Sequence, residues 1–163
     1  MYYNGSYIKK TLSYDEEILF FIQQHGIVWL QTWFLGIVSV LPLVFMFLFP
    51  MPNPIIFFVL FGILFTLTLY KYFIVAVIEM ALTNKRVIRR TGVIWVRSEE
   101  LLLSKVESVE ISQSILGRIL GYGNILFSGT GTSKVNLKNV RNPVEVKRDI
   151  EYYFGSVLEV HQE

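Results

Sequence analysis

The chain has 163 residues, enough for one ordinary domain or for a smaller domain with an additional segment. It contains no cysteine, which excludes disulfides, thiolate nucleophiles and cysteine-ligated metals, and its net charge of +2 is too small to indicate nucleic-acid binding. Hydrophobic residues make up 53% of the chain, which is high for a soluble globular protein, yet no Asp, Glu, Lys or Arg lies between Glu17 and Lys71. This asymmetry predicts a membrane segment joined to a soluble domain.

The N-terminal residues 14–26, YDEEILFFIQQHG, allow two interpretations. They could form a strand that joins the sheet of the soluble domain, or the first turns of a long first helix. The absence of charge after Glu17 favours a buried segment, so we expect a strand within a cytoplasmic N-terminal segment, residues 1–25. The acidic run Asp15, Glu16 and Glu17 is expected to be a solvated turn or strand start. No cleavable signal peptide is expected, because the first seventeen residues are polar.

Two apolar stretches, residues 26–49 and 55–80, are each long enough to cross a bilayer, which takes about 20 apolar residues. Between them lies PMPNP, residues 50–54, whose three prolines end one helix and begin the next. The sequence therefore predicts a hairpin of two transmembrane helices within residues 26–80.

The basic residues predict the orientation of this hairpin. They lie before the first span and at or after the end of the second, whereas the turn has none. By the positive-inside rule, both termini are expected in the cytoplasm. The residues expected to anchor the spans at the membrane interface are Trp29, Trp33, Tyr70 and Lys71.

Beyond Thr83 the pattern changes to short runs rich in β-branched and aromatic residues, which predict strands at 85–90, 93–103, 104–112, 124–129 and 134–140. Thr91-Gly92 and the TGTS segment are expected to be turns. Asn142, Pro143 and Glu145 then mark a helix start, followed by apolar residues at spacings of three and four. The predicted fold of residues 81–163 is a small, mostly antiparallel β-fold closed by a C-terminal amphipathic helix.

The order of these pieces resembles the bacterial pleckstrin-homology (PH) domain family in its membrane-anchored form. The matching features are the Thr-Asn-Lys-Arg start at 83–86, Thr91-Gly92, the SKVESV run at 104–109, Gly117-Arg118, Gly121-Tyr122-Gly123 and Asn142-Pro143. The resemblance implies a PH-like split β-barrel with a C-terminal helix, facing the cytoplasm from a two-helix anchor in a bacterial inner membrane. It implies no known reaction.

The glycine-rich stretch 112–133 holds five glycines and could suggest a phosphate-binding loop. A P-loop needs Gly-Lys followed by Ser or Thr between a strand and a helix. Lys134 follows a serine and leads into a predicted strand, so the glycines are expected to shape turns.

Two surfaces are candidate binding sites. The basic residues Lys85, Arg86, Arg89, Arg90 and Arg118 could bind anionic headgroups, at about 1 kcal/mol per cation near a membrane surface. Those of the 85–90 run could also simply fix the topology, and the two roles are compatible. The second set is Leu116, Ile119, Leu120 and Tyr122. Its leucines are expected to cap the barrel, and the alternative is an exposed patch for a partner subunit or the bilayer.

No catalytic residue, metal or cofactor is expected, since His25 and His161 form no metal-binding pattern. The predicted function is a non-enzymatic membrane protein that presents its PH-like domain for self-assembly or for binding a membrane-protein partner, with no role for nucleic acid. The alternatives are a module that senses anionic lipids, and an accessory subunit of a membrane transporter or enzyme. An ion relay is disfavoured because no Asp, Glu, Lys or Arg lies within the spans before Lys71.

Overall fold

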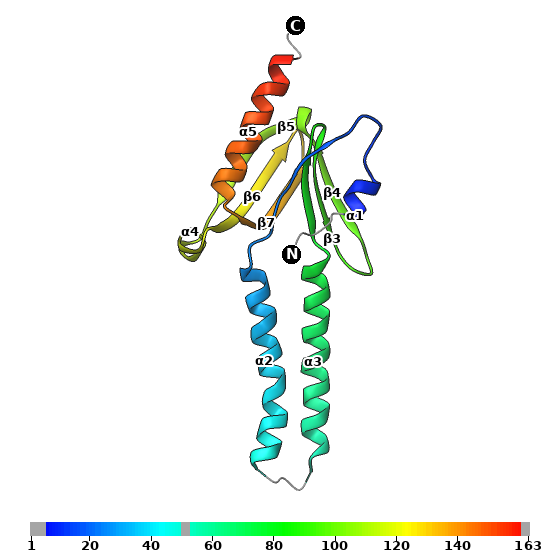
Figure 1. Ribbon diagram of the computed structural model, residues 1–163, viewed down its shortest axis with the longest axis vertical. Helices are drawn as coiled ribbons and strands as arrows, with labels where there is room; N and C mark the ends of the chain where they lie inside the picture. The colour runs from blue at the N-terminus through cyan, green and yellow to red at the C-terminus, as the bar shows by residue number, and fades with distance from the viewer. Residues whose placement is uncertain (1–5, 50–52, 161–163) are drawn as a thin grey trace. The chain divides into compact units, whose positions relative to one another are not determined.

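The computed structural model describes residues 6–49 and 53–160 (Figure 1). Most of the predicted PMPNP turn, residues 50–52, and His161 lie outside the described residues. The chain divides into two compact units. One is Gly26–Val77, and the other combines Met1–His25 with Ile78–Glu163.

The first unit is a pair of helices, α2 (Ile27–Leu48) and α3 (Ile55–Ala76), both long and apolar enough to cross a membrane. The prediction of two long apolar helices is confirmed. The residues of α2 that are buried in the pair are small or weakly polar: Thr32, Ser39 and Pro42. The Ser39 hydroxyl donates to the Gly36 carbonyl of its own helix at 2.6 Å, so it needs no outside partner. Small residues of this kind let helices approach closely in an apolar environment.

The second unit begins with a short helix, α1 (Ser6–Lys10), and contains two antiparallel sheets. The first sheet has the order β1 (Ile18–Phe21), β2 (Glu79–Thr83), β3 (Arg86–Thr91) and β4 (Arg97–Leu102). Residues 18–21 are therefore a strand, which was one of the two interpretations of the N-terminal segment. β1 and β2 are neighbours in the sheet although both apolar helices lie between them in the chain.

The second sheet has the order β5 (Val106–Ser112), β6 (Tyr122–Gly129) and β7 (Lys134–Arg141). A 3-10 turn, η1 (Leu103–Lys105), leads into it, α4 (Ile115–Leu120) connects β5 to β6, and α5 (Pro143–Val160) follows β7. Residues 23–25 join the two sheets, because the His25 N–H donates to the Asn139 carbonyl at 2.7 Å and the Arg141 N–H to the Gln23 carbonyl at 3.0 Å. The sheets do not close into a barrel, and β4 and β5 remain edge strands. The predicted fold class is confirmed.

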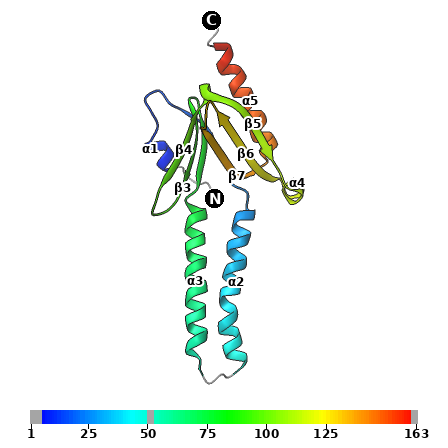
Figure 2. The same ribbon diagram turned by 180° about the vertical axis from the view of Figure 1, so that it is seen from behind.

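The main hydrophobic core lies between the two sheets and α5. Its fully buried members include Val87 of β3, Phe127 of β6, Leu137 of β7 and Ile150 of α5. β6 alternates strictly between half-buried and buried residues, as expected of a strand with one face on a core. α5 packs its apolar face over β5 and β6 (Figures 1 and 2).

Two predicted boundaries were wrong. The second span was predicted to run to residue 80, but α3 ends at Ala76 and residues 79–80 begin the inner strand β2. All five residues of β2 are buried, so the strand shows no alternation of buried and exposed residues that would separate it from the apolar run of α3. The strand predicted over 93–103 is confined to 97–102, because Gly92 has a φ of +96° and turns the chain early. Residues 93–96 form a loop between β3 and β4.

Replacing Leu82 by alanine tests the assignment of residues 79–83 to the core. Leu82 is almost completely buried in β2, so the cavity is expected to destabilise the domain by about 2–5 kcal/mol. The measurement is the thermal unfolding midpoint of the full chain in detergent, followed by circular dichroism. Leu67→Ala, at a half-exposed position of α3, is the matched control. Equal, small shifts for both variants would contradict the core position of β2.

Candidate functional site

Arg86 lies at the centre of a polar network that ties the N-terminal segment to the first sheet. Its guanidinium makes a bidentate ion pair with Glu16, with Nε donating to Oε1 at 2.9 Å and Nη2 to Oε2 at 2.8 Å. Nη2 also donates to the Thr11 carbonyl, and Nη1 to Glu100 of β4. Since Glu16 and Arg86 are 70 residues apart, the network fixes a long-range connection.

The Glu16 carboxylate is held ionised by its surroundings. Its side chain is only 1% exposed, and this burial alone would raise its pKa. Hydrogen bonds from Arg86, from the Ser13 N–H at 2.9 Å and from the Thr83 hydroxyl at 2.8 Å outweigh the burial, so the pKa of Glu16 lies below its ordinary value. The bond to Glu16 in turn raises the pKa of Arg86. Glu16 was expected to be solvated, and this was wrong because its partners lie far away in the sequence.

The other basic residues of the run are also engaged within the domain. Arg89 pairs with Glu99 of β4 at 3.1 Å, and Arg90 lies 3.8 Å from Glu79 of β2. The Lys85 ammonium donates to the Tyr14 carbonyl at 3.1 Å. Each of these cations thus has a partner inside the domain. Their binding of lipid headgroups stays a prediction.

The apolar residues around Arg118 form α4, a single exposed helical turn. The Ser114 hydroxyl caps it by accepting the Gly117 N–H at 3.1 Å, and Gly121 ends it with a φ of +75°. Gly117 is buried so tightly that a Cβ there would lie 2.6 Å from the Tyr122 carbonyl oxygen. The exposed side chains of α4 are Ile115, Leu116, Ile119 and Leu120, together with Arg118. The expectation that these leucines cap the barrel was therefore wrong.

The loop between β3 and β4 is a second exposed apolar element, which the sequence reasoning missed. Val93, Ile94, Trp95 and Val96 are all exposed, and the Trp95 side chain is 89% accessible. Gly92 fixes the bend, because a Cβ there would lie 2.0 Å from the Trp95 carbonyl oxygen. The sequence did contain an indication of this loop: residues 93–96 are all apolar, whereas a half-buried strand alternates apolar and polar residues.

A groove lies between β1 and α5 and has a volume of about 490 Å³. One wall is β1, an edge strand of its sheet, and the other is the aromatic face of α5. Across the groove the rings of Phe20 and Tyr153 lie 6.1 Å apart. Its lining residues are Leu19, Phe20, Phe21, Gln23, Val146, Asp149, Tyr152 and Tyr153.

The predicted interface anchors lie at the ends of α2 and α3 that join the second unit in the chain. Trp29 contacts Tyr72 edge-on, with ring centroids 5.3 Å apart. Trp33, Tyr70 and Lys71 are exposed on the same unit. Their anchoring at a membrane interface stays a prediction.

The described residues contain no group of three or more His, Asp or Glu side chains that could hold a metal ion. The ring of His25 stacks instead on Tyr122, with centroids 5.3 Å apart.

Residues 21–153, most of the chain, match the family model described as "Bacterial PH domain". No curated protein and no solved structure matches the chain.

Replacing Glu16 by glutamine tests the network. The variant is expected to unfold more easily at neutral pH, by about 1.5–3 kcal/mol, the usual range for hydrogen bonds to charged groups. Because the folded pKa of Glu16 is lowered, its contribution is complete above the ordinary pKa of 4.5 and is lost as pH falls through the folded pKa. As the pH is lowered below 4.5, the thermal unfolding temperature of the unsubstituted chain should therefore decrease, and that of Glu16→Gln should decrease less. Glu17→Gln, at the exposed neighbouring carboxylate, should leave both properties unchanged. Identical pH profiles for the unsubstituted chain and Glu16→Gln would contradict this role.

Proposed function

Because the chain belongs to the bacterial PH domain family, we propose that it is a non-enzymatic inner-membrane protein that presents its PH-like domain for self-assembly or partner binding. In this proposal α2 and α3 cross the membrane, and both termini lie in the cytoplasm. The spans carry one charged residue, Lys71, near the end of α3, and this residue and the basic residues before α2 and after α3 support this topology.

The groove between β1 and α5 is the observation that carries the proposal. An edge strand offers unpaired backbone N–H and C=O groups, and an adjoining apolar surface can hold alternate side chains of an added strand. β1 and the aromatic face of α5 supply both features side by side. The groove therefore suits an extended, apolar protein segment.

A second copy of the chain is the first partner to consider. Anchoring in a membrane confines the copies to one plane and raises their effective concentration. The β1 edges of two copies are identical, so antiparallel pairing about a twofold axis would satisfy both at once. β1 has only four residues, so the association is expected to be modest in strength.

Sensing of anionic lipids is the second candidate. It is supported by Arg118, which is exposed on α4 and makes no ion pair among the residues that the structure describes. The pairing of Arg86, Arg89 and Arg90 with glutamates weakens this candidate, because fewer cations remain for headgroups.

Replacing Tyr152 by serine tests the groove. Tyr152 lines it, is 75% exposed and can be removed without opening the core. Tyrosines often supply much of the binding energy of an interface, so self-association should weaken about tenfold, or about 1.4 kcal/mol. The measurement is the oligomer fraction of the full chain against its density in vesicles, read by chemical cross-linking.

Val144→Ser is the matched control, since Val144 is an exposed apolar residue of α5 that does not line the groove. It should leave the oligomer fraction unchanged. Equal loss in both variants would contradict the role of the groove. An unsubstituted chain that stays monomeric at all densities would contradict self-assembly and favour a different membrane protein as the partner.

A further inference from the structure

The loop between β3 and β4 lies at the end of the sheet where the chain arrives from α3. Glu79, the first residue of β2, pairs with Arg90, and Thr91 at the end of β3 pairs with Arg97 at the start of β4. Only Val77 and Ile78 separate Glu79 from the last residue of α3. Strand register therefore places residues 92–96 beside the junction with the second apolar helix.

α4 lies beside the other junction. His25 is the last residue before the helical unit, and its ring stacks on that of Tyr122, two residues after the end of α4. The His25 N–H is fixed by the Asn139 carbonyl of β7. Within the sheet-containing unit, both views show α4 and the β3–β4 loop at the same end of the strands (Figures 1 and 2).

The fold holds both elements out toward solvent. Ile94 and Trp95 are 82% and 89% exposed, and Ile115 and Ile119 of α4 are 80% and 74% exposed. The loop carries no charge from Gly92 to Val96. Two separate apolar projections at one end of a small domain are unusual unless something covers them. We name them the apolar rim, which comprises residues 93–96 with Ile115, Leu116, Ile119 and Leu120.

We propose that the apolar rim inserts into the interfacial region of the lipid bilayer in which α2 and α3 are anchored. The inference rests on that proposed anchoring. The bilayer is the favoured occupant because each half of the rim adjoins a junction to an apolar helix, so the membrane surface is within reach of both. Tryptophan beside aliphatic residues is the composition that partitions to this region. Insertion of this kind depends on apolar burial and not on ion pairs, which fits the internal pairing of the arginines.

The native tryptophans allow a direct test, since the chain has three: Trp29, Trp33 and Trp95. A chain with Trp29→Phe and Trp33→Phe reports on Trp95 alone. It is reconstituted in phosphatidylcholine–phosphatidylglycerol vesicles, with and without lipids brominated near the top of the acyl chain. Trp95 emission is expected to be quenched by the brominated lipids and to resist aqueous acrylamide several-fold better than a fully exposed tryptophan. The quenching should persist in about 1 M salt, where the Debye length is about 3 Å.

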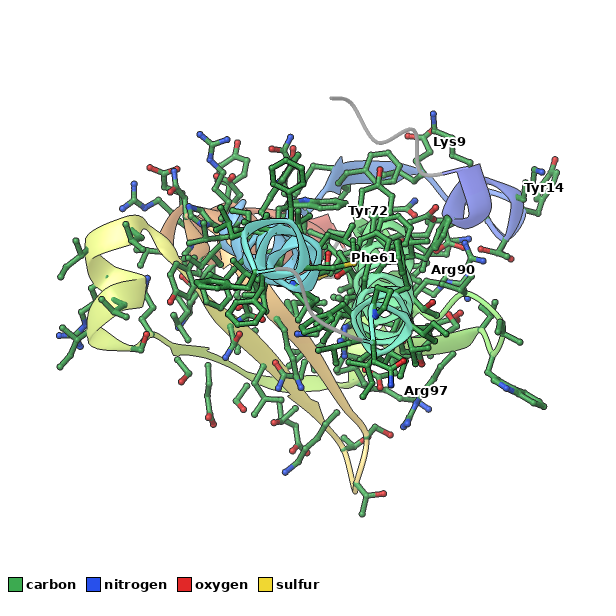
Figure 3. All side chains as sticks on the ribbon, turned by 90° about the horizontal axis from the view of Figure 1, so that it is seen from below. Lys9, Tyr14, Phe61, Tyr72, Arg90 and Arg97 are labelled. Carbon is green, nitrogen blue, oxygen red and sulfur yellow. The ribbon has the colours of Figure 1, made fainter. Side chains whose placement is uncertain are left out.

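Two further probes are placed in a chain whose three tryptophans are phenylalanine. Ile119→Trp tests α4 and should behave as Trp95 does. Tyr14→Trp is the exposed control, because Tyr14 is 98% exposed beside the β2–β3 turn, at the opposite end of the strands. Figure 3 shows its side chain projecting away from the loop after α1. This probe should be quenched by acrylamide and not by brominated lipid.

The Trp95→Phe chain, which keeps Trp29 and Trp33, distinguishes the anchoring of α2 and α3 in the bilayer from the insertion of the apolar rim. If it is quenched by brominated lipid while Trp95 and the Ile119→Trp probe are not, the anchoring holds and the rim inference is overturned. If none is quenched, the anchoring and the inference both fail. Protection of Trp95 from acrylamide that grows with protein density, without quenching by brominated lipid, would assign the rim to a contact between copies and overturn its insertion.

Discussion

The pairing of β1 with β2 is the constraint on which the rest of the molecule depends. Phe21 pairs with Ala81 and the Ile22 N–H donates to the Met80 carbonyl at 2.9 Å, although α2 and α3 lie between these residues in the chain. The two apolar helices thus take the place of a hairpin turn between adjacent antiparallel strands. Closing so long a loop costs conformational entropy, and the packing of α2 on α3 offsets part of it. The pairing brings the end of β1 and the start of β2, and with them both junctions to the helical unit, to the same end of the first sheet.

The charged residues of the domain serve mainly to hold it together, whereas its exposed candidate binding surfaces are mainly apolar. Arginines 86, 89 and 90 hold strands and the N-terminal segment together through Glu16, Glu79, Glu99 and Glu100. Glu16, nearly inaccessible to water, makes β1 dependent on β3 through a bond that no local pattern contains. The surfaces left for recognition are largely apolar: the groove beside β1, and the loop and helix at the end of the sheet near both junctions. If α2 and α3 anchor the chain as proposed, such surfaces suit partners in the same membrane, where apolar contact and high local concentration compensate for small interfaces.

Local sequence patterns were sufficient for the elements that bury one face or are apolar all round. The two long helices, the strands around Val87, Phe127 and Leu137, and α5 follow from periodicity and turn residues. β2 was not predicted because a strand buried on both faces shows no alternation of polar and apolar residues, so its start was assigned to the preceding apolar helix. Residues 93–96 were predicted as strand because their residue types favour strands. In the structure Gly92 turns the chain, and pairing between β3 and β4 starts only at Thr91 and Arg97. The Glu16 site and the groove could not be predicted, since each joins segments far apart in the sequence. The face on which α4 contacts the sheet is that of Gly117, which packs tightly against the Tyr122 carbonyl, and no residue spacing reveals this contact.

The topology of the chain in its membrane is the most direct test of this account. The protein contains no cysteine, so single substitutions give unambiguous labelling sites. Asn53→Cys lies between α2 and α3, whereas Tyr14→Cys and Gly131→Cys lie in the sheet-containing unit. With a membrane-impermeant maleimide on intact spheroplasts, the account predicts labelling of Asn53→Cys alone, and labelling of all three after permeabilisation. Labelling of Tyr14→Cys or Gly131→Cys in intact spheroplasts would contradict it.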